Sequence, residues 1–304
     1  MASLSDRIEY LLARMGMAVA CRLTRGQAIW LGTSLGRLAH RLLGSRRRLA
    51  QDNMRRALGD SLTEAQVREN VRKVFINIGL TVVELARYPR LGREGLRALV
   101  DPAGFEPVRE ALKGGRGAIL ATAHFGNWEI LGASLGAHGF PAAALALTQQ
   151  NKLVNDLIQG LRRETGTKVM EAPANARQVF RVLQENYVVY MAADQHAPSG
   201  TLVLDFFDRP AAVVRGPALF AARCKSPIVP MLMRRDDGGR LIQISGQIIY
   251  PPESGDEEAD IRTMTMRYLR FLEEQIRKWP DQWMWTHNRW KLKPPESNHD
   301  GVSA

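Results

Sequence analysis

The stretch Ala118-Ile-Leu-Ala-Thr-Ala-His-Phe-Gly-Asn-Trp-Glu129 decides the fold, because it contains both halves of an α/β unit. Its first six residues are a short apolar run preceded by Gly117, which is typical of a buried strand. A helical run begins near Trp128, so the strand leads through a tight turn into a helix. Ligand sites in α/β folds concentrate at the carboxyl ends of strands, and this turn lies at such an end.

The turn carries His124, and Glu129 follows about one helical turn later. A carboxylate at this spacing can hold an imidazole in one tautomer and stabilise the imidazolium formed during proton transfer. Gly126 lets the chain pass close to a ligand, and the helix N-terminus favours negative charge nearby. The spacing alone fits two interpretations equally well. One is a catalytic base with its orienting carboxylate, and the other is a capped turn with a surface histidine.

Beyond this unit, apolar runs of strand length alternate with helical segments, which predicts an α/β domain with a mixed, mostly parallel sheet flanked by helices. The segment 234–240 is rich in Asp and Gly between two apolar runs and predicts a hairpin turn. The predicted strands are 142–147, 188–192, 203–206, 228–233 and 241–249, and the predicted helices are 151–165, 174–185, 215–223 and 261–278.

The N-terminal region is basic and amphipathic. Apolar residues recur at helical spacing from Ile8 to Leu43, and two further helices are predicted over 45–88. Residues 1–60 contain 11 arginines and four acidic residues, which gives +7 of the net charge of +11. These arginines are interleaved with Leu, Ile, Met and Trp rather than with the Gly, Tyr and Phe of an RNA-binding surface. The pattern therefore favours an anionic phospholipid surface over a nucleic acid.

The same region predicts a protein that lies on a membrane. A membrane-spanning helix needs about 20 mostly apolar residues. Only seven uncharged residues separate Arg14 from Arg22, and Arg25 further interrupts any signal-peptide-like core. Cys21 and Cys224 form no zinc or CxxC spacing, so a reducing compartment is expected. We expect a membrane-associating region at 1–44, a main domain at 45–293 and a polar, disordered tail at 294–304.

The His124-x4-Glu129 spacing resembles the His-x4-Asp/Glu motif of glycerolipid-type acyltransferases. The longer string Ala121-Thr-Ala-His-Phe-Gly-Asn-Trp-Glu129 is similar to the version in the family of late acyltransferases of lipid A biosynthesis, which mycobacterial phosphatidylinositol mannoside acyltransferases share. Three other strings resemble that family in the expected order: Ser45–Ala57, Asp194-Gln195 with Asp205–Ala211, and Trp283–Trp290.

The resemblance implies an O-acyltransferase of the glycerolipid-acyltransferase fold at the cytoplasmic face of the inner membrane, acting in lipopolysaccharide or other glycolipid biosynthesis. His124 would be the general base and Glu129 its partner, with a single tetrahedral intermediate and no acyl-enzyme. Acyl carrier protein or coenzyme A would supply the acyl thioester, and no metal or further cofactor is implied. The residues expected to bind substrate are Gly126, Asn127, Asp194, Gln195, Arg209 and Arg289.

Two departures from the family pattern affect the acceptor side of this expectation. Many relatives carry an arginine in a Tyr-Arg-Pro-like string before Asn151, whereas this chain has Thr148-Gln149-Gln150. Headgroup contacts there are expected to differ, which leaves lipid A precursors, other glycolipids and hydroxylated secondary metabolites open as acceptors. The family's usual glycine between Phe207 and Arg209 is Asp208.

The residues leave three alternatives to this expectation: a serine hydrolase, a metal site and a lipid-binding protein. Gly132-Ala-Ser134-Leu-Gly136 fits the G-x-S-x-G pattern of serine hydrolases, but that motif needs a strand immediately before it. The same pattern recurs at Gly32–Gly36, within the amphipathic region. A metal site from His124, Asp194 and His196 lacks the paired spacing of such ligands. The remaining alternative is a peripheral lipid-binding protein without turnover.

Overall fold

The computed structural model describes residues 3–172, 176–196 and 202–291. Within them a six-stranded sheet has the order β3-β2-β4-β1-β7-β8, and a separate two-stranded hairpin pairs β5 with β6. The first five strands of that order run parallel, and β8 returns antiparallel beside β7. The predicted mixed, mostly parallel sheet is confirmed. The strands are β1 (Ala118–Thr122), β2 (Ala142–Leu147), β3 (Lys168–Ala172), β4 (Val188–Ala192), β5 (Leu202–Asp205), β6 (Pro210–Val213), β7 (Ile228–Arg235) and β8 (Leu241–Ser245).

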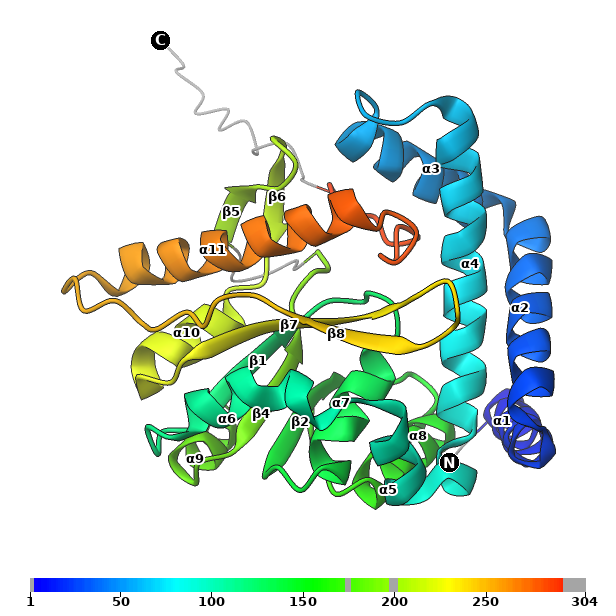
Figure 1. Cartoon of the computed structure of the whole chain (residues 1–304), viewed down its shortest axis with the longest axis horizontal. Coiled ribbons are helices and arrows are strands. Elements are labelled where there is room, and N and C mark those ends of the chain that lie inside the picture. The colour runs from blue at the N-terminus through cyan, green and yellow to red at the C-terminus, as the bar shows by residue number, and fades with distance from the viewer. Residues whose placement is uncertain (1–2, 173–175, 197–201, 292–304) are drawn as a thin grey trace, which may run out of the picture.

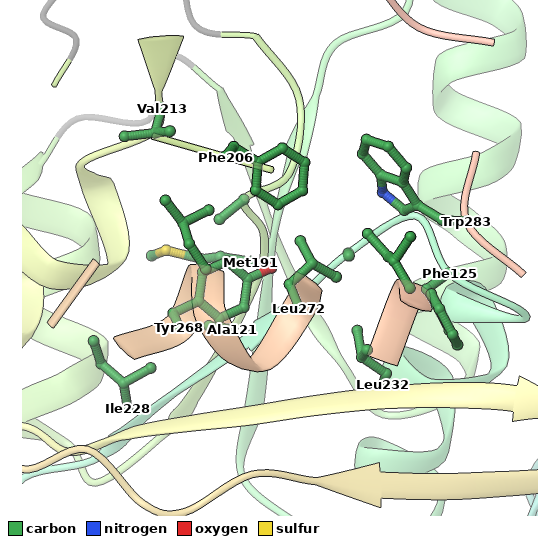
Figure 2. Close-up of a cluster of buried hydrophobic side chains, with 14 of the residues drawn as sticks. Ala121, Phe125, Met191, Phe206, Val213, Ile228, Leu232, Tyr268, Leu272 and Trp283 are labelled. Carbon is green, nitrogen blue, oxygen red and sulfur yellow. The ribbon is translucent and has the colours of Figure 1, made fainter. Parts of the chain in front are cut away.

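Both faces of the sheet are covered, which is why β1 reads as a continuous apolar run. Ile119 and Ala121 face a core formed with α9 (Ala176–Gln184), α10 (Gly216–Cys224) and α11 (Glu257–Lys278). Figure 2 shows Ala121 beside Tyr268 and Leu272 of α11, with Trp283 at one side of the same cluster. Ala118 and Leu120 face the opposite core, which includes residues of α5 (Tyr88–Leu99), α6 (Glu106–Leu112), α7 (Trp128–Ala137) and α8 (Lys152–Glu164).

The N-terminal quarter is helical, as predicted: α1 (Leu4–Arg22), α2 (Arg25–Leu42), α3 (Gly44–Leu58) and α4 (Glu64–Ala86). In Figure 1, α2 and α4 run side by side at one edge of the molecule, and α3 lies across the end of α4. Gly36 allows the close approach of α2 to α4, because a Cβ there would lie 2.5 Å from the Ile76 Cα atom. In the described part of the chain, no helix is both long enough and apolar enough to cross a bilayer.

The sequence analysis predicted neither strand β3 nor strand β6, and it also missed the helices α5 and α6 and the short helix η1 (Pro102–Phe105). The missed strand β3 is an edge strand of mixed composition, Lys-Val-Met-Glu-Ala, which shows no continuous apolar run. The missed strand β6 begins with Pro210, a residue that marks loops more often than strands. The predicted tail at 294–304 lies outside the described residues. The proposed boundary at residue 44 stays a prediction.

Candidate active site

His124 and Asp194 meet at the carboxyl edge of the sheet. His124 follows β1 and Asp194 follows β4, and these two strands are neighbours in parallel register, with Thr122 opposite Ala192. Carboxyl ends of parallel strands lie at the same edge, so two residues 70 positions apart in sequence come into contact. The His124 Nδ1 atom lies 2.8 Å from Asp194 Oδ1.

The contacts of Asp194 fix the tautomer of His124. Asp194 Oδ2 accepts hydrogen bonds from the His124 backbone N–H at 3.0 Å and from Trp283 Nε1 at 2.8 Å. An ionised carboxylate only accepts hydrogen bonds, so the neutral imidazole carries its proton on Nδ1. The lone pair is then on Nε2, the atom that a general base uses. The Gln195 side-chain amide lies 3.4 Å from both ring nitrogens.

The pKa values of His124 and Asp194 agree with an ionised carboxylate beside a basic imidazole. Burial alone would lower the pKa of His124, but the charge of Asp194 and its hydrogen bond outweigh burial, so the pKa of His124 is raised above its usual value. Burial alone would raise the pKa of the Asp194 carboxyl, but His124 and the donated hydrogen bonds lower it overall. Asp194 thus stays ionised, and His124 is a stronger base than a free imidazole.

Glu129 does not take the partner position predicted for it. Its carboxylate pairs with Arg162 of α8, with 2.7 Å between Glu129 Oε1 and Arg162 Nη2. The placement differs from the predicted pairing because Glu129 lies in the first turn of α7 and its carboxylate reaches α8, while β4 brings Asp194 to the imidazole. A catalytic role of Glu129 stays a prediction. Glu129 acts on His124 through its charge, which further raises the pKa of the imidazole.

The turn at Gly126 is held tightly against β7. Gly126 has φ 53°, and a Cβ there would lie 1.9 Å from the Met233 carbonyl oxygen, so only glycine fits. Asn127 is fully buried, and its Oδ1 accepts from the Ile130 N–H as the N-cap of α7. Its Nδ2 donates to Glu84, which also pairs with Arg235 of β7. Gly126 and Asn127 therefore build the turn, and the Glu84–Arg235 pair beneath it was not predicted.

An apolar pocket of ≈ 720 Å³ opens beside this turn. Helices α2 and α4 form most of its wall, and the segment 284–287 closes one side. Met284 lines the pocket and donates its backbone N–H to the His124 carbonyl at 2.9 Å, so the pocket adjoins the histidine. The lining residues are Leu35, Gly36, Leu38, Ala39, Leu42, Leu43, Arg46, Phe75, Ile78, Gly79, Val82, Met284, Thr286 and His287.

Comparison with known proteins identifies the family of this chain. The profile of a family described as bacterial lipid A biosynthesis acyltransferase matches residues 4–292. The chain belongs to this family. It is 26% identical over 270 residues to the lipid A biosynthesis lauroyltransferase of Escherichia coli, covering 87% of this chain and 85% of that protein. It is 24% identical over 245 residues to the phosphatidylinositol mannoside acyltransferase of Mycolicibacterium smegmatis, covering 74% and 79%.

Membership makes the chain an acyltransferase, which argues against the predicted lipid-binding protein without turnover. Ser134 lies in the middle of α7 and is fully buried, so it is not at a strand-to-helix elbow. Among the residues that the structure describes, no group of three or more His, Cys, Asp or Glu side chains has an arrangement suited to a metal ion.

Two arginines predicted to bind substrate differ in placement. Arg209 of this acyltransferase is exposed and donates from Nε to the Arg56 carbonyl at 2.9 Å, so it braces the hairpin β5–β6 against α3. Arg289 is only 1% exposed, lies over the Phe206 ring and donates from Nη1 to the Ala212 carbonyl at 2.6 Å. Burial lowers the pKa of Arg289 to about 10. Neither contact brings an arginine to the His124 ring.

The segment after α11 completes the acyltransferase site, and the sequence predicted only Arg289 of this segment as a site residue. Trp283 donates to Asp194, and the buried Asn53 of α3 donates from Nδ2 to the Trp285 carbonyl at 2.9 Å and the His287 carbonyl at 2.7 Å. A signal existed, because Asn53 and Trp283 both lie in strings that resemble the family. Their contact could not be read from the sequence, since it joins positions more than 230 residues apart.

Proposed function

We propose that this acyltransferase moves a fatty acyl group from a thioester of acyl carrier protein or coenzyme A onto a hydroxyl of a glycolipid, such as a lipid A precursor. His124 removes the hydroxyl proton through Nε2, and no acyl-enzyme forms. One observation carries the proposal: Asp194 fixes the imidazole with Nε2 unprotonated, in contact with the Gln195 amide, and the His124 carbonyl bonds to Met284 in the wall of an apolar pocket. A pocket of that size and lining suits an acyl chain.

The reaction needs a base because a hydroxyl is a weak nucleophile at neutral pH. Transfer of its proton to His124 accompanies attack on the thioester carbonyl, and Asp194 stabilises the resulting imidazolium. Collapse of the tetrahedral intermediate expels the thiolate, which takes the proton from His124. In this scheme Asp194 and Trp283 orient the base, Glu129 supports it only through its charge, and Gln195, Arg209 and Arg289 keep their expected substrate-binding roles as proposals.

We also propose that the protein binds peripherally to the cytoplasmic face of the inner membrane. Large apolar side chains of α1 and α2 are exposed, with Trp30 at 70% and Leu12 at 59%. In the described part of the chain, the arginines of these two helices make no ion pair with a carboxylate: Arg7, Arg14, Arg22, Arg25, Arg37 and Arg41. Apolar side chains flanked by free cations suit an anionic bilayer surface.

Lipid mass spectrometry of host cells tests the function. Cells producing the wild type, His124→Ala or Ser134→Ala are compared. We expect one glycolipid to gain a single acyl chain with the wild type and with folded Ser134→Ala, but not with His124→Ala. Loss of the product with Ser134→Ala alone, or an unchanged lipid profile with the wild type, would refute the proposal.

A further inference from the structure

The turn around His124 has no free backbone donors at the positions next to the histidine. The N–H groups of Phe125, Gly126 and Asn127 donate to the carbonyls of Ala123, Gln282 and Met233. A tetrahedral intermediate formed beside His124 carries a negative oxygen, and each preorganised donor to such an oxygen contributes substantially to rate. These three N–H groups do not supply that donor, so one is needed from elsewhere in the site.

His287 is a neutral donor with its proton position fixed. The backbone N–H of His196 donates to His287 Nε2 at 3.2 Å. A backbone N–H can only donate, so Nε2 must be unprotonated and the ring proton is on Nδ1. Nδ1 has no hydrogen-bond partner in the described part of the protein, which leaves this N–H for a ligand.

The position of His287 suits such a ligand. It lines the apolar pocket together with Met284, whose N–H is bonded to the His124 carbonyl. Asn53 Nδ2 donates a hydrogen bond to the His287 carbonyl at 2.7 Å, which fixes the backbone that positions the ring. Two arginines are competing donors: Arg289 is buried at 1% exposure and is absent from the pocket wall, whereas Arg46 lines the pocket and donates from Nη1 to the Thr286 carbonyl at 3.5 Å.

The two histidines have opposite environments. The pKa of His124 is raised, with Asp194 outweighing burial. For His287, burial outweighs the raising effect of Asp194, and the charges of His124, Arg289 and His196 add to burial, so its pKa is lowered. Environments that separate the pKa values of two neighbouring groups are typical of a base and a hydrogen-bond donor in one site. His287 thus stays neutral at pH values where His124 cycles between base and acid.

We propose that His287 is a second catalytic residue, whose Nδ1–H binds the carbonyl oxygen of the acyl thioester and stabilises the oxyanion. This inference rests on the proposed function. The acceptor hydroxyl oxygen bonds to the carbonyl carbon, its proton passes to His124 Nε2, and the C=O π electrons move onto the oxygen held by His287. When the C=O re-forms, the C–S bond breaks and the thiolate takes the proton from His124. The products are the ester and a thiol, and both histidines return to their starting state.

The test uses the full-length protein, thioesters of dodecanoic acid with coenzyme A and with acyl carrier protein, and the acceptor lipid found by mass spectrometry. His287→Gln keeps an acceptor near Nε2 but removes the donor at Nδ1. We expect kcat to fall about 100-fold with the donor KM within twofold of the wild type. His287→Asn places an amide N–H near the lost Nδ1 donor and should recover at least tenfold over His287→Gln. A merely structural histidine would not produce this ranking.

Long-range ¹H–¹⁵N spectra of the wild type give an independent readout of the ring. We expect the His287 proton on Nδ1, in a signal that is absent from both variants. A proton on Nε2, or a His287→Gln variant that keeps more than half of the wild-type kcat, would overturn the inference. If the wild type transfers no acyl group, the proposed function fails, whereas the tautomer is still decided by the spectrum.

Discussion

The carboxyl edge of the sheet and the outer face of α1 and α2 contrast in how their polar and apolar groups are satisfied. At the edge, both oxygens of Asp194 are occupied and the His124 ring is held in one tautomer. On the outer face, Trp30 and Leu12 are largely exposed and the neighbouring arginines have no carboxylate partners among the described residues. Polar groups that are hydrogen-bonded within the protein hold the catalytic histidine in place. Exposed apolar side chains and arginines without carboxylate partners are instead suited to bind another surface. Substitutions at the sheet edge should therefore reduce acyl transfer, and substitutions on the outer face should reduce membrane binding.

The largest effect is expected for Asp194→Asn. Two donors point at Oδ2, so the amide oxygen stays there and the amide NH₂ faces His124 Nδ1. Nδ1 then becomes an acceptor, and the proton moves to Nε2, where it blocks the base. We expect kcat to fall about 10⁴-fold, as for a wrong-tautomer substitution in a serine protease triad, measured by single-turnover acyl transfer.

The matched control is Gln195→Leu, which removes the 3.4 Å contacts with the same imidazole and leaves its carboxylate in place. We expect it to keep at least a tenth of the wild-type kcat. Equal losses in the two variants would contradict the special role of Asp194.

The second effect concerns Glu129, whose partner is Arg162. Glu129→Gln leaves a largely buried guanidinium without its countercharge, and this should lower the free energy of unfolding by about 3 kcal/mol in denaturant titrations. Replacing both residues, as in Glu129→Gln with Arg162→Met, should recover part of that loss. If Glu129→Gln left stability unchanged and abolished transfer as completely as Asp194→Asn, Glu129 would be the orienting carboxylate after all.

The third effect is the pH dependence of the wild type. The base must be neutral, and the pKa of His124 is raised above its ordinary value of about 6.5 by Asp194, against the effect of burial. We expect kcat/KM to rise with pH until neutral pH or above, about tenfold per unit along the acid limb. The stabilising contribution of the pair has the opposite trend: it is full below the unfolded pKa and is lost as pH rises through the folded one. An acid limb centred below pH 6 would contradict the assignment.

The smallest effect is expected on the outer face. Trp30→Ser should weaken binding to vesicles of phosphatidylethanolamine and phosphatidylglycerol about tenfold in a flotation assay, because part of the indole surface no longer enters the bilayer. The free energy of unfolding should change by less than about 0.5 kcal/mol.

Tyr250 provides the matched control, since it is an exposed aromatic residue beyond β8, at 57% exposure. Tyr250→Ser should bind vesicles like the wild type. Equal losses for the two variants would show that the outer face is not the membrane-binding surface.

The fold was largely readable because its decisive signals are local. Apolar runs such as 118–123 and 188–192 mark buried strands directly, and helical spacing marks the N-terminal helices. His124 was also readable, from its position after a strand. The identity of its partner was not, because Glu129 is near in sequence whereas Asp194 becomes near only when β4 pairs with β1. Helix geometry explains the error, since the Glu129 side chain is carried toward α8.

Asp208 shows what a departure from the family pattern can mean physically. It has φ 55°, in the left-handed region where glycine is favoured, and Phe207 before it has φ 53°. The usual glycine of the family therefore suits this backbone. The aspartate occupies it at a conformational cost, which asparagine and aspartate tolerate better than most residues.

The hydrogen bonds from Asn53 to the Trp285 and His287 carbonyls have a consequence for biosynthesis. The strands that carry His124 and Asp194 leave the ribosome well before Trp283, Trp285 and His287 do. A nascent chain can thus pair β1 with β4 and place the base beside its carboxylate while one wall of the pocket is still missing. Closure of the site waits until a late segment returns to a helix made more than 230 residues earlier, so a chain stalled before residue 283 would hold the dyad without an assembled enzyme.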